Sequence, residues 1–356
     1  MNSQINRQAL DEVLAKVVGD LSASYGGVMV SLGDKLGLYR AMRGVGPLTS
    51  GEIAKRASCS ERYVREWLNS QAAAGYVLYH ASSGTYELTP EQAAVLADDS
   101  STVYFAPAWQ VVASLWHDEP QTLEAIRTGK GVLWSERDAR LSCGVAAFYR
   151  NGYRASLVAQ WLPALDGVTA KLEAGARVAD VGCGHGHSTV FMAQAFPRSR
   201  FVGIDTHEES LRAARSHAAE AGVADRVSFD CAGANAYREK GVDLICFFDA
   251  LHDMGHPDAA ARHALGALAP GGTVMLVEPY ADDRPENNFN PVGRLYYSAS
   301  TAICCAHAMA ENGPYVLGAQ AGAARLEKIF REAGYGGFRV AAQTPFNLIL
   351  EARAAK

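Results

Sequence analysis

The sequence lacks the cysteine spacing of a disulfide-rich or metal-stapled domain. Its seven cysteines are an odd number and include no Cys-x-x-Cys pair, and Cys183, Cys231 and Cys246 fall in predicted buried strands or turns. This usage favours reduced core thiols, so we expect a cytoplasmic protein. Cys304 and Cys305 are adjacent, and by themselves they cannot form a metal site.

The sequence also lacks an excess of positive charge and any clear targeting segment. Lys and Arg number 33 against 38 Asp and Glu, a net charge of −5, which argues against a dominant attraction to nucleic acid. The N-terminal residues show no cationic start followed by an apolar stretch, so we expect no signal peptide. No apolar run approaches the roughly 18 residues of a membrane span.

With 356 residues, 49% of them hydrophobic and 20% charged, the chain is long enough for two domains and a substantial core. We predict three segments: a winged-helix and dimerisation domain over 1–100, a helical connecting and lid segment over 101–172, and a cofactor-binding domain over 173–356. A long insertion at 280–323, polar and turn-rich in its first part and helical after it, is predicted to cover the substrate, because loops of that length in a compact domain are usually functional or disordered.

The most informative stretch runs from Arg177 to Ser188. An apolar run, Val178 to Val181, predicts a buried parallel strand, and Gly182, Gly184 and Gly186 follow at every second position before a helical pattern begins. A strand, a tight glycine turn and a helix start form a loop suited to a nucleotide, because glycine allows positive φ and close approach of a ligand.

Two acidic residues decide which nucleotide this loop takes. Asp205 ends the next apolar run, about 20 residues on, where an acid can accept hydrogen bonds from both ribose hydroxyls. Asp180 is buried at the first strand end, where it would repel a pyrophosphate but favour an ammonium or sulfonium. A nicotinamide oxidoreductase, the rival interpretation, is disfavoured by Asp180 and by His187 at the third position of its glycine fingerprint.

The stretch Asp-x-Gly-Cys-Gly-x-Gly resembles motif I of class I S-adenosylmethionine (SAM) methyltransferases. That resemblance implies a SAM cofactor, with S-adenosylhomocysteine as product. The acid that often holds adenine in this family is missing from Ala232–Ala236, so a backbone carbonyl or Asn235 would take its place. The predicted cofactor residues are Asp180, Gly182, Cys183, Gly184, Gly186, Asp205, Thr206, Gly233, Ala234 and Asp249.

Alternating strands and helices from 177 onward predict an α/β, Rossmann-like domain. Seven apolar runs, the last pair joined by a tight loop, match the seven-stranded class I methyltransferase sheet with its antiparallel last strand. The ligand should then lie at the carboxyl ends of the first strands, at the switch point of the sheet.

The N-terminal hundred residues predict a winged helix preceded by helices. Helical periodicity over 7–43 is expected to break at Gly26-Gly27; a helix-turn-helix over 49–74 and two short strands at 76–80 and 85–88 follow. DNA binding would use Arg62 and Arg65, but glutamates interleave with them and the wing has no lysine or arginine. A dimerisation module is therefore favoured, and the resemblance implies a homodimer without nucleic acid.

The segment over 100–175 is helical and unusually aromatic, with a glycine-hinged loop at Gly129–Trp134 suited to closing over a pocket. Any single ring could simply pack a domain join, but as a group they are the best candidates for an apolar substrate wall. The predicted substrate residues are Trp134, Phe148, Tyr149, Tyr153, Tyr296 and Tyr297.

After the fourth strand the sequence reads Phe-Phe-Asp-Ala-Leu-His-Asp-Met, Phe247 to Met254. This resembles the Leu-His-Asp segment of small-molecule O-methyltransferases with an N-terminal winged-helix domain, where that histidine is the general base. The resemblance implies His252 as base with Asp253 beside it; a merely pocket-lining His252 is the alternative. His185 and His187 flank the glycine turn without further ligands, so no metal site is predicted.

Together these features predict a SAM-dependent methyltransferase acting on a small, hydrophobic or aromatic acceptor, with O-methylation favoured. The alternative is a SAM-responsive winged-helix transcription regulator. Whether oxygen, nitrogen, sulfur or carbon accepts the methyl group is left open by the sequence, as is the acceptor itself.

Overall fold

A computed structural model describes residues 5–355. The chain divides into two compact units: residues up to 113 with 143–151 form the first, and residues 114–142 with 152 onward form the second. Each is described by itself below.

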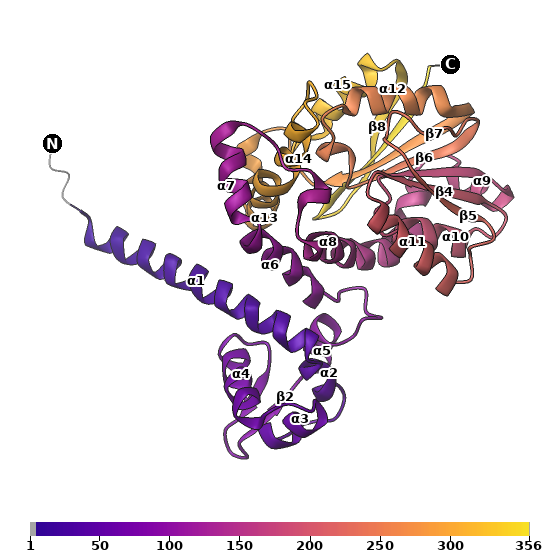
Figure 1. Ribbon diagram of the computed structural model, residues 1–356. Coiled ribbons are helices and arrows are strands. Elements are labelled where there is room, and N and C mark those ends of the chain that lie inside the picture. The colour runs from indigo at the N-terminus through magenta and orange to yellow at the C-terminus, as the bar shows by residue number, and fades with distance from the viewer. Residues whose placement is uncertain (1–4, 356) are drawn as a thin grey trace. The chain divides into compact units, whose positions relative to one another are not determined.

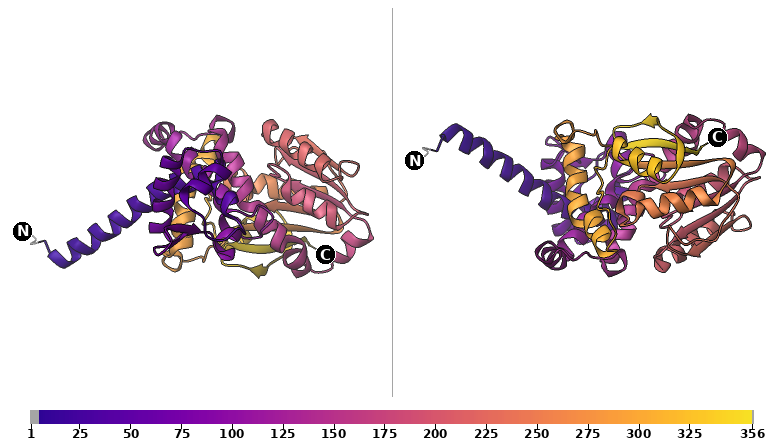
Figure 2. Two further views of the ribbon diagram at one scale, coloured as in Figure 1. Left: turned by 90° about the horizontal axis from the view of Figure 1, so that it is seen from below. Right: turned by 90° about the horizontal axis from the view of Figure 1, so that it is seen from above.

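The first unit begins with α1 (Arg7–Lys35), a single continuous helix of 29 residues capped by the Asn6 side chain (Figure 1, Figure 2). The predicted break at Gly26-Gly27 is therefore wrong. A glycine inside a helix costs only about 1 kcal/mol relative to alanine, which packing can offset. A Cβ on Gly27 would lie 2.4 Å from the Trp109 ring, so this glycine admits close contact rather than ending the helix.

Gly33, six residues further along α1, also admits close contact with aromatic rings. Comparison with Gly26 on the same helix gives a test of this packing. A Cβ on Gly33 would lie 2.4 Å from Trp67 and 2.8 Å from Tyr39, so Gly33→Ala is expected to destabilise the unit by about 1–3 kcal/mol. Gly26→Ala, which meets nothing within 4 Å, is expected to stabilise it by about 0.5–1 kcal/mol. Thermal unfolding followed by circular dichroism compares the two; equal shifts would contradict the packing argument.

The winged-helix prediction is confirmed. Helices α2 (Leu38–Met42), α3 (Ser50–Arg56) and α4 (Glu61–Ala73) precede the two-stranded wing, β1 (Leu78–His80) and β2 (Thr85–Glu87), and α5 (Pro90–Leu96) follows. Thr49 and Glu52 form the capping box that starts α3. The core of the unit gathers around Ile53 and Leu68, which are fully buried.

The arginines that DNA binding would use are engaged on α4 itself. Arg62 pairs with Glu66 at 2.5 Å and Arg65 with Glu61 at 3.3 Å. Such pairs one turn apart partly neutralise each arginine's charge on the exposed face of the helix. That this helix does not bind DNA stays a prediction.

Along most of its length α1 exposes apolar side chains. Only Gly27, Val30 and Gly33 are buried, while residues such as Val18 are 65% exposed. The expectation that no apolar stretch approaches the length of a membrane span is wrong for this helix. By length and composition alone α1 could span a membrane, because it has 29 residues and an 18-residue window in it has a mean hydropathy of 1.3. An ion pair between Lys16 and Asp20 lies on the same helix.

The second unit is built on a seven-stranded sheet with the order β5-β4-β3-β6-β7-β9-β8. The first five strands are parallel, and β9 lies antiparallel between β7 and β8, which confirms the predicted Rossmann-like sheet. The strands are β3 (Arg177–Val181), β4 (Arg200–Asp205), β5 (Val227–Cys231), β6 (Val242–Phe248), β7 (Leu268–Pro279), β8 (Tyr335–Gln343) and β9 (Asn347–Ala354).

Helices cover both faces of this sheet (Figure 1). The helices α10 (His187–Ala195) and α11 (Glu208–Glu220) lie on one face, and α12 (Pro257–Ala267) packs beside α15 (Ala323–Glu332) on the other. The strand order reverses between β3 and β6, so the carboxyl ends of these two strands border the switch point where ligands bind in open α/β sheets.

The remaining helical elements follow here in chain order. They are η1 (Ala106–Ala108), α6 (Trp109–His117), α7 (Glu119–Thr128), η2 (Trp134–Glu136), α8 (Ala139–Gly152), the π-helix η3 (Tyr153–Trp161), η4 (Leu162–Ala164), α9 (Val168–Ala174), η5 (Leu251–Asp253), η6 (Pro285–Asn288), α13 (Pro291–Ala299), the π-helix η7 (Ser300–Cys304) and α14 (Cys305–Ala310).

The predicted hinge loop packs directly onto the insertion. The backbone N–H of Val132 donates to the carbonyl of Ala306 at 2.9 Å, and a Cβ on Gly131 would lie 2.0 Å from the Ala310 nitrogen. Only glycine permits that approach between the loop and α14. The loop that carries Trp134 is therefore fixed to the helical half of the insertion.

Candidate functional site

The glycine turn after β3 has the conformation that its residues require. Gly182, Gly184 and Gly186 all have positive φ, at 77°, 50° and 70°. Added Cβ atoms at Gly182 and Gly186 would lie 2.6 Å from Ala250 and 2.8 Å from Ala214, whereas one at Gly184 meets nothing within 4 Å. The turn is thus packed from behind and open at Gly184, where a ligand could touch the backbone.

Asp205, at the end of β4, is locked to this turn. Its Oδ2 accepts the Gly184 N–H at 2.8 Å and its Oδ1 accepts the His207 N–H at 2.8 Å. Each oxygen keeps a lone pair, so both can still accept a ribose hydroxyl. The Asp205 carbonyl also accepts the Ala232 N–H at 3.0 Å, which brings the loop with Gly233 and Ala234 to the same edge.

Asp180 is fully buried beneath the turn, and it organises the start of α10. Its Oδ2 accepts the hydroxyls of Ser188 at 2.6 Å and Thr189 at 2.5 Å, a role for these two residues that the sequence analysis missed. Its Oδ1 is buried without a hydrogen bond. Burial raises the pKa of Asp180 to about 6, although the two hydroxyls oppose the rise.

This pKa predicts an unusual pH dependence of stability. Between about pH 4 and pH 6 the folded protein holds a proton on Asp180 that the unfolded chain has released, so the free energy of unfolding falls as the pH rises. The loss is about 3 kcal/mol for a shift of roughly two units, and it is complete above pH 6. Denaturant unfolding at several pH values measures it, and Asp180→Asn is expected to flatten the curve. The prediction would be contradicted if the free energy of unfolding of the wild type rose from pH 4 to pH 6 and Asp180→Asn gave the same pH dependence.

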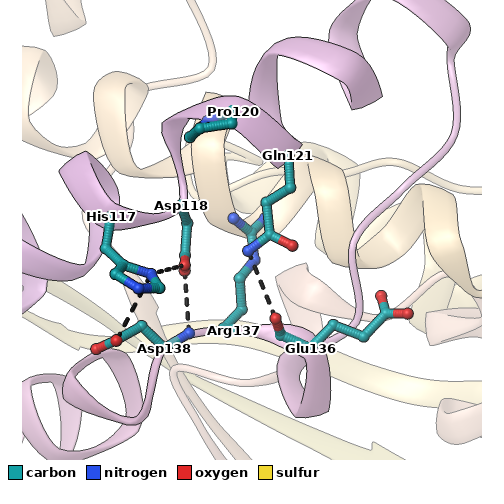
Figure 3. A pocket seen from close by; sticks show the side chains of 7 residues that line it. All are labelled: His117, Asp118, Pro120, Gln121, Glu136, Arg137 and Asp138. Atoms are coloured by element: carbon teal, nitrogen blue, oxygen red, sulfur yellow. Dashed lines mark hydrogen bonds and ion pairs between the residues drawn. The ribbon is translucent and has the colours of Figure 1, made fainter.

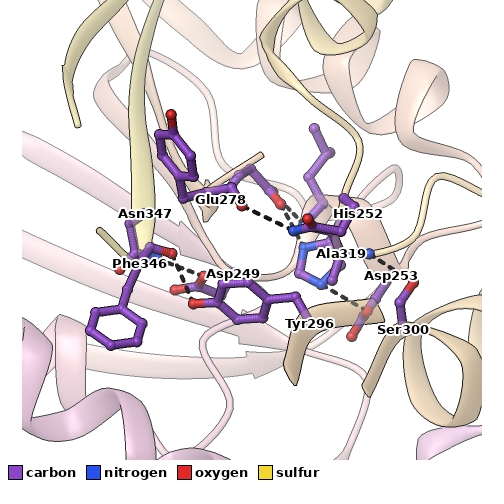
Figure 4. Close-up of polar contacts among 12 residues, drawn as sticks. Asp249, His252, Asp253, Glu278, Tyr296, Ser300, Ala319, Phe346 and Asn347 are labelled. Carbon is purple, nitrogen blue, oxygen red and sulfur yellow. Dashed lines mark hydrogen bonds and ion pairs between the residues drawn. The ribbon is translucent and has the colours of Figure 1, made fainter. Parts of the chain in front are cut away.

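A second polar cluster lies at the carboxyl ends of β6 and β7 (Figure 4). His252 Nδ1 lies 2.5 Å from Glu278 Oε2, and His252 Nε2 lies 3.1 Å from Asp253 Oδ1. Burial alone would lower the pKa of His252, but the carboxylates of Glu278 and Asp253 outweigh it and raise that pKa well above its usual value. In this arrangement the imidazole is protonated, so its use as a base, which stays a prediction, requires that proton to leave first.

Glu278 was not among the predicted site residues. It is the middle residue of the Val-Glu-Pro run at the end of β7 and is buried, and its Oε1 also accepts the Leu251 N–H at 3.2 Å. An acid at the carboxyl end of an otherwise apolar central strand is the signal that could have identified it.

Asp249 follows β6 with a φ of 50°, a left-handed conformation that non-glycine residues seldom adopt. Asn347 donates its Nδ2–H to one carboxylate oxygen at 3.0 Å (Figure 4). Tyr153 donates its hydroxyl to the other carboxylate oxygen at 3.4 Å. Strained residues of this kind persist where surrounding contacts fix them and are concentrated at functional sites.

The structure brings three of the predicted aromatic residues to these clusters. The Trp134 Nε1–H donates to Asp253 at 3.3 Å, Tyr153 packs against Phe248 with ring centroids 5.4 Å apart, and the buried Tyr296 donates its hydroxyl to the Phe346 carbonyl at 2.8 Å. Tyr297, on the same helix as Tyr296, is half-buried.

Phe148 and Tyr149 belong to the first compact unit, where Phe148 packs edge-on against Phe105 and Tyr149. Their role in acceptor binding stays a prediction. Cys183, which is buried, and Thr206, which is exposed, lie at the cofactor loop, and their predicted roles in cofactor binding also stay predictions.

The histidines beside the glycine turn form a ring cluster. His187 stacks on His217 with centroids 4.5 Å apart, and the His217 Nδ1 lies 2.9 Å from the His185 carbonyl. Burial, assisted by His217 and His207, lowers the pKa of His185 to about 4, so its ring is neutral near pH 7.

A separate polar pocket is lined by residues 117, 118, 120, 121 and 136–138 (Figure 3). Asp118 accepts from His117 at 2.9 Å and from the Asp138 N–H at 3.1 Å, while Arg137 donates to the Ala302 carbonyl at 2.5 Å. The bond from Arg137 ties the segment around Trp134 to the insertion, and the other two bonds hold the pocket residues to one another. These polar residues therefore have a structural role.

Two family models match the chain. Residues 24–98 match the Rv2258c-like winged HTH domain and residues 172–334 match a methyltransferase domain. The chain therefore carries a winged HTH domain followed by a methyltransferase domain, as its resemblance to winged-helix methyltransferases predicts.

Similar proteins agree with this domain composition. The trans-aconitate 2-methyltransferase of Methylobacterium radiotolerans is 30% identical over 167 residues, which are 46% of this chain and 56% of that protein. The chain thus spans about half the length of this curated relative.

Solved structures extend the likeness to both domains. An O-methyltransferase family protein from Burkholderia thailandensis has a TM-score of 0.69 at 18% identity, covering 99% of each chain. Human N-acetylserotonin methyltransferase in complex with SAM has a TM-score of 0.68 at 16% identity, covering 100% of each. At these identities the likeness establishes the fold.

Proposed function

We propose that this protein transfers the methyl group of SAM to a small, apolar or aromatic acceptor, with O-methylation favoured. One observation carries the proposal: the open backbone at Gly184 is tied directly to the ribose-binding candidate Asp205, at the switch point of a methyltransferase-type sheet. Several proteins with this fold are O-methyltransferases by name, which supports oxygen as the acceptor atom.

The residues present fit SAM. Asp205 suits the ribose hydroxyls, and the unsatisfied Oδ1 of Asp180 supplies a negative group for a cationic part of the cofactor. When bound, SAM supplies an electrophilic methyl carbon on a sulfonium. The acceptor hydroxyl would take this methyl group from sulfur and would lose its proton to a base, for which His252 is the candidate once its own proton has left.

The charges of the site favour a neutral acceptor over a polyanion. Asp249, Asp253 and Glu278 place three carboxyl groups at one edge of the sheet, against the single imidazole of His252 (Figure 4). A tricarboxylate such as trans-aconitate would meet this negative field. The nearby rings of Trp134 and Tyr153 suit an aromatic or apolar body instead.

Calorimetric titration with SAM and with S-adenosylhomocysteine tests the cofactor. Saturable binding of both is expected. An acceptor screen that measures S-adenosylhomocysteine release then tests the reaction, with neutral phenols expected to react and tricarboxylates not. A wild-type protein that binds neither nucleotide would overturn the proposal.

A homodimer is part of the proposal. The exposed apolar row of α1, which includes Val13, Val18 and Leu21, is suited to a second copy of the same helix. Light scattering is expected to give twice the 38.0 kDa chain mass, and Val18→Asp to shift it toward one chain. Tyr63→Asp, an exposed change on α4, is the control; a monomeric wild type would contradict the proposal.

A cytoplasmic location and the absence of nucleic acid binding complete the proposal. All seven cysteines are free thiols, which suits a reducing compartment. The glutamate-paired arginines of α4 favour the enzyme over a DNA-binding regulator. A salt-dependent shift of genomic fragments in a gel would revive the regulator.

A further inference from the structure

His307 lies on α14, in the second half of the insertion, and a carboxylate holds its ring. Its Nε2 lies 3.4 Å from Glu311 Oε1, one turn along the chain, and Glu311 Oε2 accepts the Gly255 N–H at 2.7 Å. Glu311 is therefore fixed at both oxygens, and it fixes the orientation of the imidazole in turn. A ring held at one nitrogen in this way presents its other nitrogen in a defined direction.

The other nitrogen of this ring has no partner in the folded chain. His307 Nδ1 is buried, and within residues 5–355 no group forms a hydrogen bond with it. The side chain as a whole is only 13% exposed. A buried polar atom without a hydrogen bond is costly and uncommon, so this nitrogen calls for a partner that the chain itself does not supply.

Two side chains connect His307 to the candidate base, His252. The ring of Trp134 lies edge-on to His307, with centroids 6.5 Å apart, and the Trp134 Nε1–H donates to Asp253 at 3.3 Å. Asp253 Oδ1 pairs in turn with His252 Nε2 at 3.1 Å. Burial raises the pKa of Asp253, but His252 and the thiol of Cys304 outweigh it and lower that pKa. His307 adds to this lowering, so it lies within electrostatic reach of the same carboxylate.

The tautomer of His307 decides what kind of group can meet Nδ1. Burial raises the pKa of Glu311, but the hydrogen bonds from His307 and from the Gly255 N–H outweigh it and lower that pKa, so Glu311 is ionised. An ionised carboxylate only accepts hydrogen bonds, which places the proton of the neutral imidazole on Nε2. Nδ1 is then an acceptor, and a group that meets it must donate a hydrogen bond.

We propose that His307 Nδ1 accepts a hydrogen bond from a second donor group of the methyl acceptor, which makes the acceptor a dihydroxy or amino-hydroxy aromatic compound rather than a simple phenol. This inference rests on the proposed function, because it assigns a contact in the acceptor site of that reaction. The reacting hydroxyl would lie at His252 and the second donor at His307, with Trp134 beside the ring that joins them. A site with a buried acceptor discriminates against compounds that lack the matching donor.

Calorimetric titration of protein saturated with S-adenosylhomocysteine tests the contact, with phenol, catechol, resorcinol and hydroquinone as probes. The three diols carry their second hydroxyl at three different distances from the first, so at least one of them is expected to reach both groups. That diol is expected to bind the wild type about 10-fold tighter than phenol, the effect of one net hydrogen bond. His307→Phe keeps a ring beside Trp134 and removes the nitrogen, so it is expected to bind that diol no tighter than phenol.

Two further variants make the result specific to the nitrogen. His307→Asn, whose amide oxygen can take the place of Nδ1, is expected to retain most of the preference, and it decides the matter if His307→Phe does not fold. Met309→Ala, a change at an exposed position of the same helix, is the matched control and should bind all the probes as the wild type does.

A wild type that binds no diol tighter than phenol overturns this inference, as does a preference that persists in His307→Phe. Calorimetry with SAM on the same preparations separates it from the proposed function. Protein that binds SAM but shows no preference for a diol refutes only the contact at His307. If neither SAM nor S-adenosylhomocysteine binds, the proposed function fails, and titration of the free protein with the same probes decides whether the diol site exists.

Discussion

Replacing Asp205 with asparagine is expected to lower the affinity for SAM by about 100-fold. An ionised carboxylate that accepts hydrogen bonds from two ribose hydroxyls contributes about 1.5–3 kcal/mol per bond, and an amide offers only one acceptor oxygen. The new NH₂ group would also face the N–H of Gly184 or His207, both of which now donate to Asp205. Isothermal titration calorimetry measures the affinity directly.

Two measurements keep this result interpretable. Asp230→Asn, at an exposed position on the neighbouring strand β5, is the matched control and should bind SAM as the wild type does. Thermal unfolding of Asp205→Asn shows whether the turn still folds. A folded variant with unchanged affinity would mean that the ribose lies elsewhere.

Removing the Glu278 carboxylate is expected to cost about 3–5 kcal/mol of folding free energy. Glu278→Ala leaves the buried imidazolium of His252 without its nearest carboxylate and the Leu251 N–H without its acceptor. For a unit of this size the melting temperature would fall by about 10 °C. Thermal unfolding followed by circular dichroism measures the change.

Glu278→Gln separates charge from packing, because it retains the shape of the side chain and one acceptor oxygen. It should lose less than half as much stability as Glu278→Ala. If Glu278→Ala loses under about 1 kcal/mol, the pair with His252 is not a buried ion pair, and the protonated state inferred for the histidine would be wrong.

Local sequence signals predicted the elements whose causes are local. The capping box at Thr49 marks the start of α3, and glycines at 182, 184 and 186 have the positive φ that the turn was expected to need. The helix break expected at Gly26-Gly27 is absent, because the contact that keeps the helix continuous comes from a distant part of the chain. Helix α1 continues because Trp109, more than 80 residues along the chain, packs against Gly27.

The candidate site shows the same division. Asp180, Asp205 and His252 are identifiable because each lies near the carboxyl end of a strand in a recognisable pattern. Glu278 and Cys304 reach His252 from a later strand and from the insertion, and no spacing in the sequence records that approach.

The position of β9 has a consequence for synthesis of the protein. Residues 347–354 leave the ribosome after the other six strands of this sheet, yet they lie between β7 and β8 within it. Until they emerge, β7 presents an unpaired edge of apolar residues such as Val274 and Leu276, which invites pairing with other nascent chains. Folding of this domain during translation is therefore completed only after release of its final strand, and chaperone demand should be greatest just before that moment.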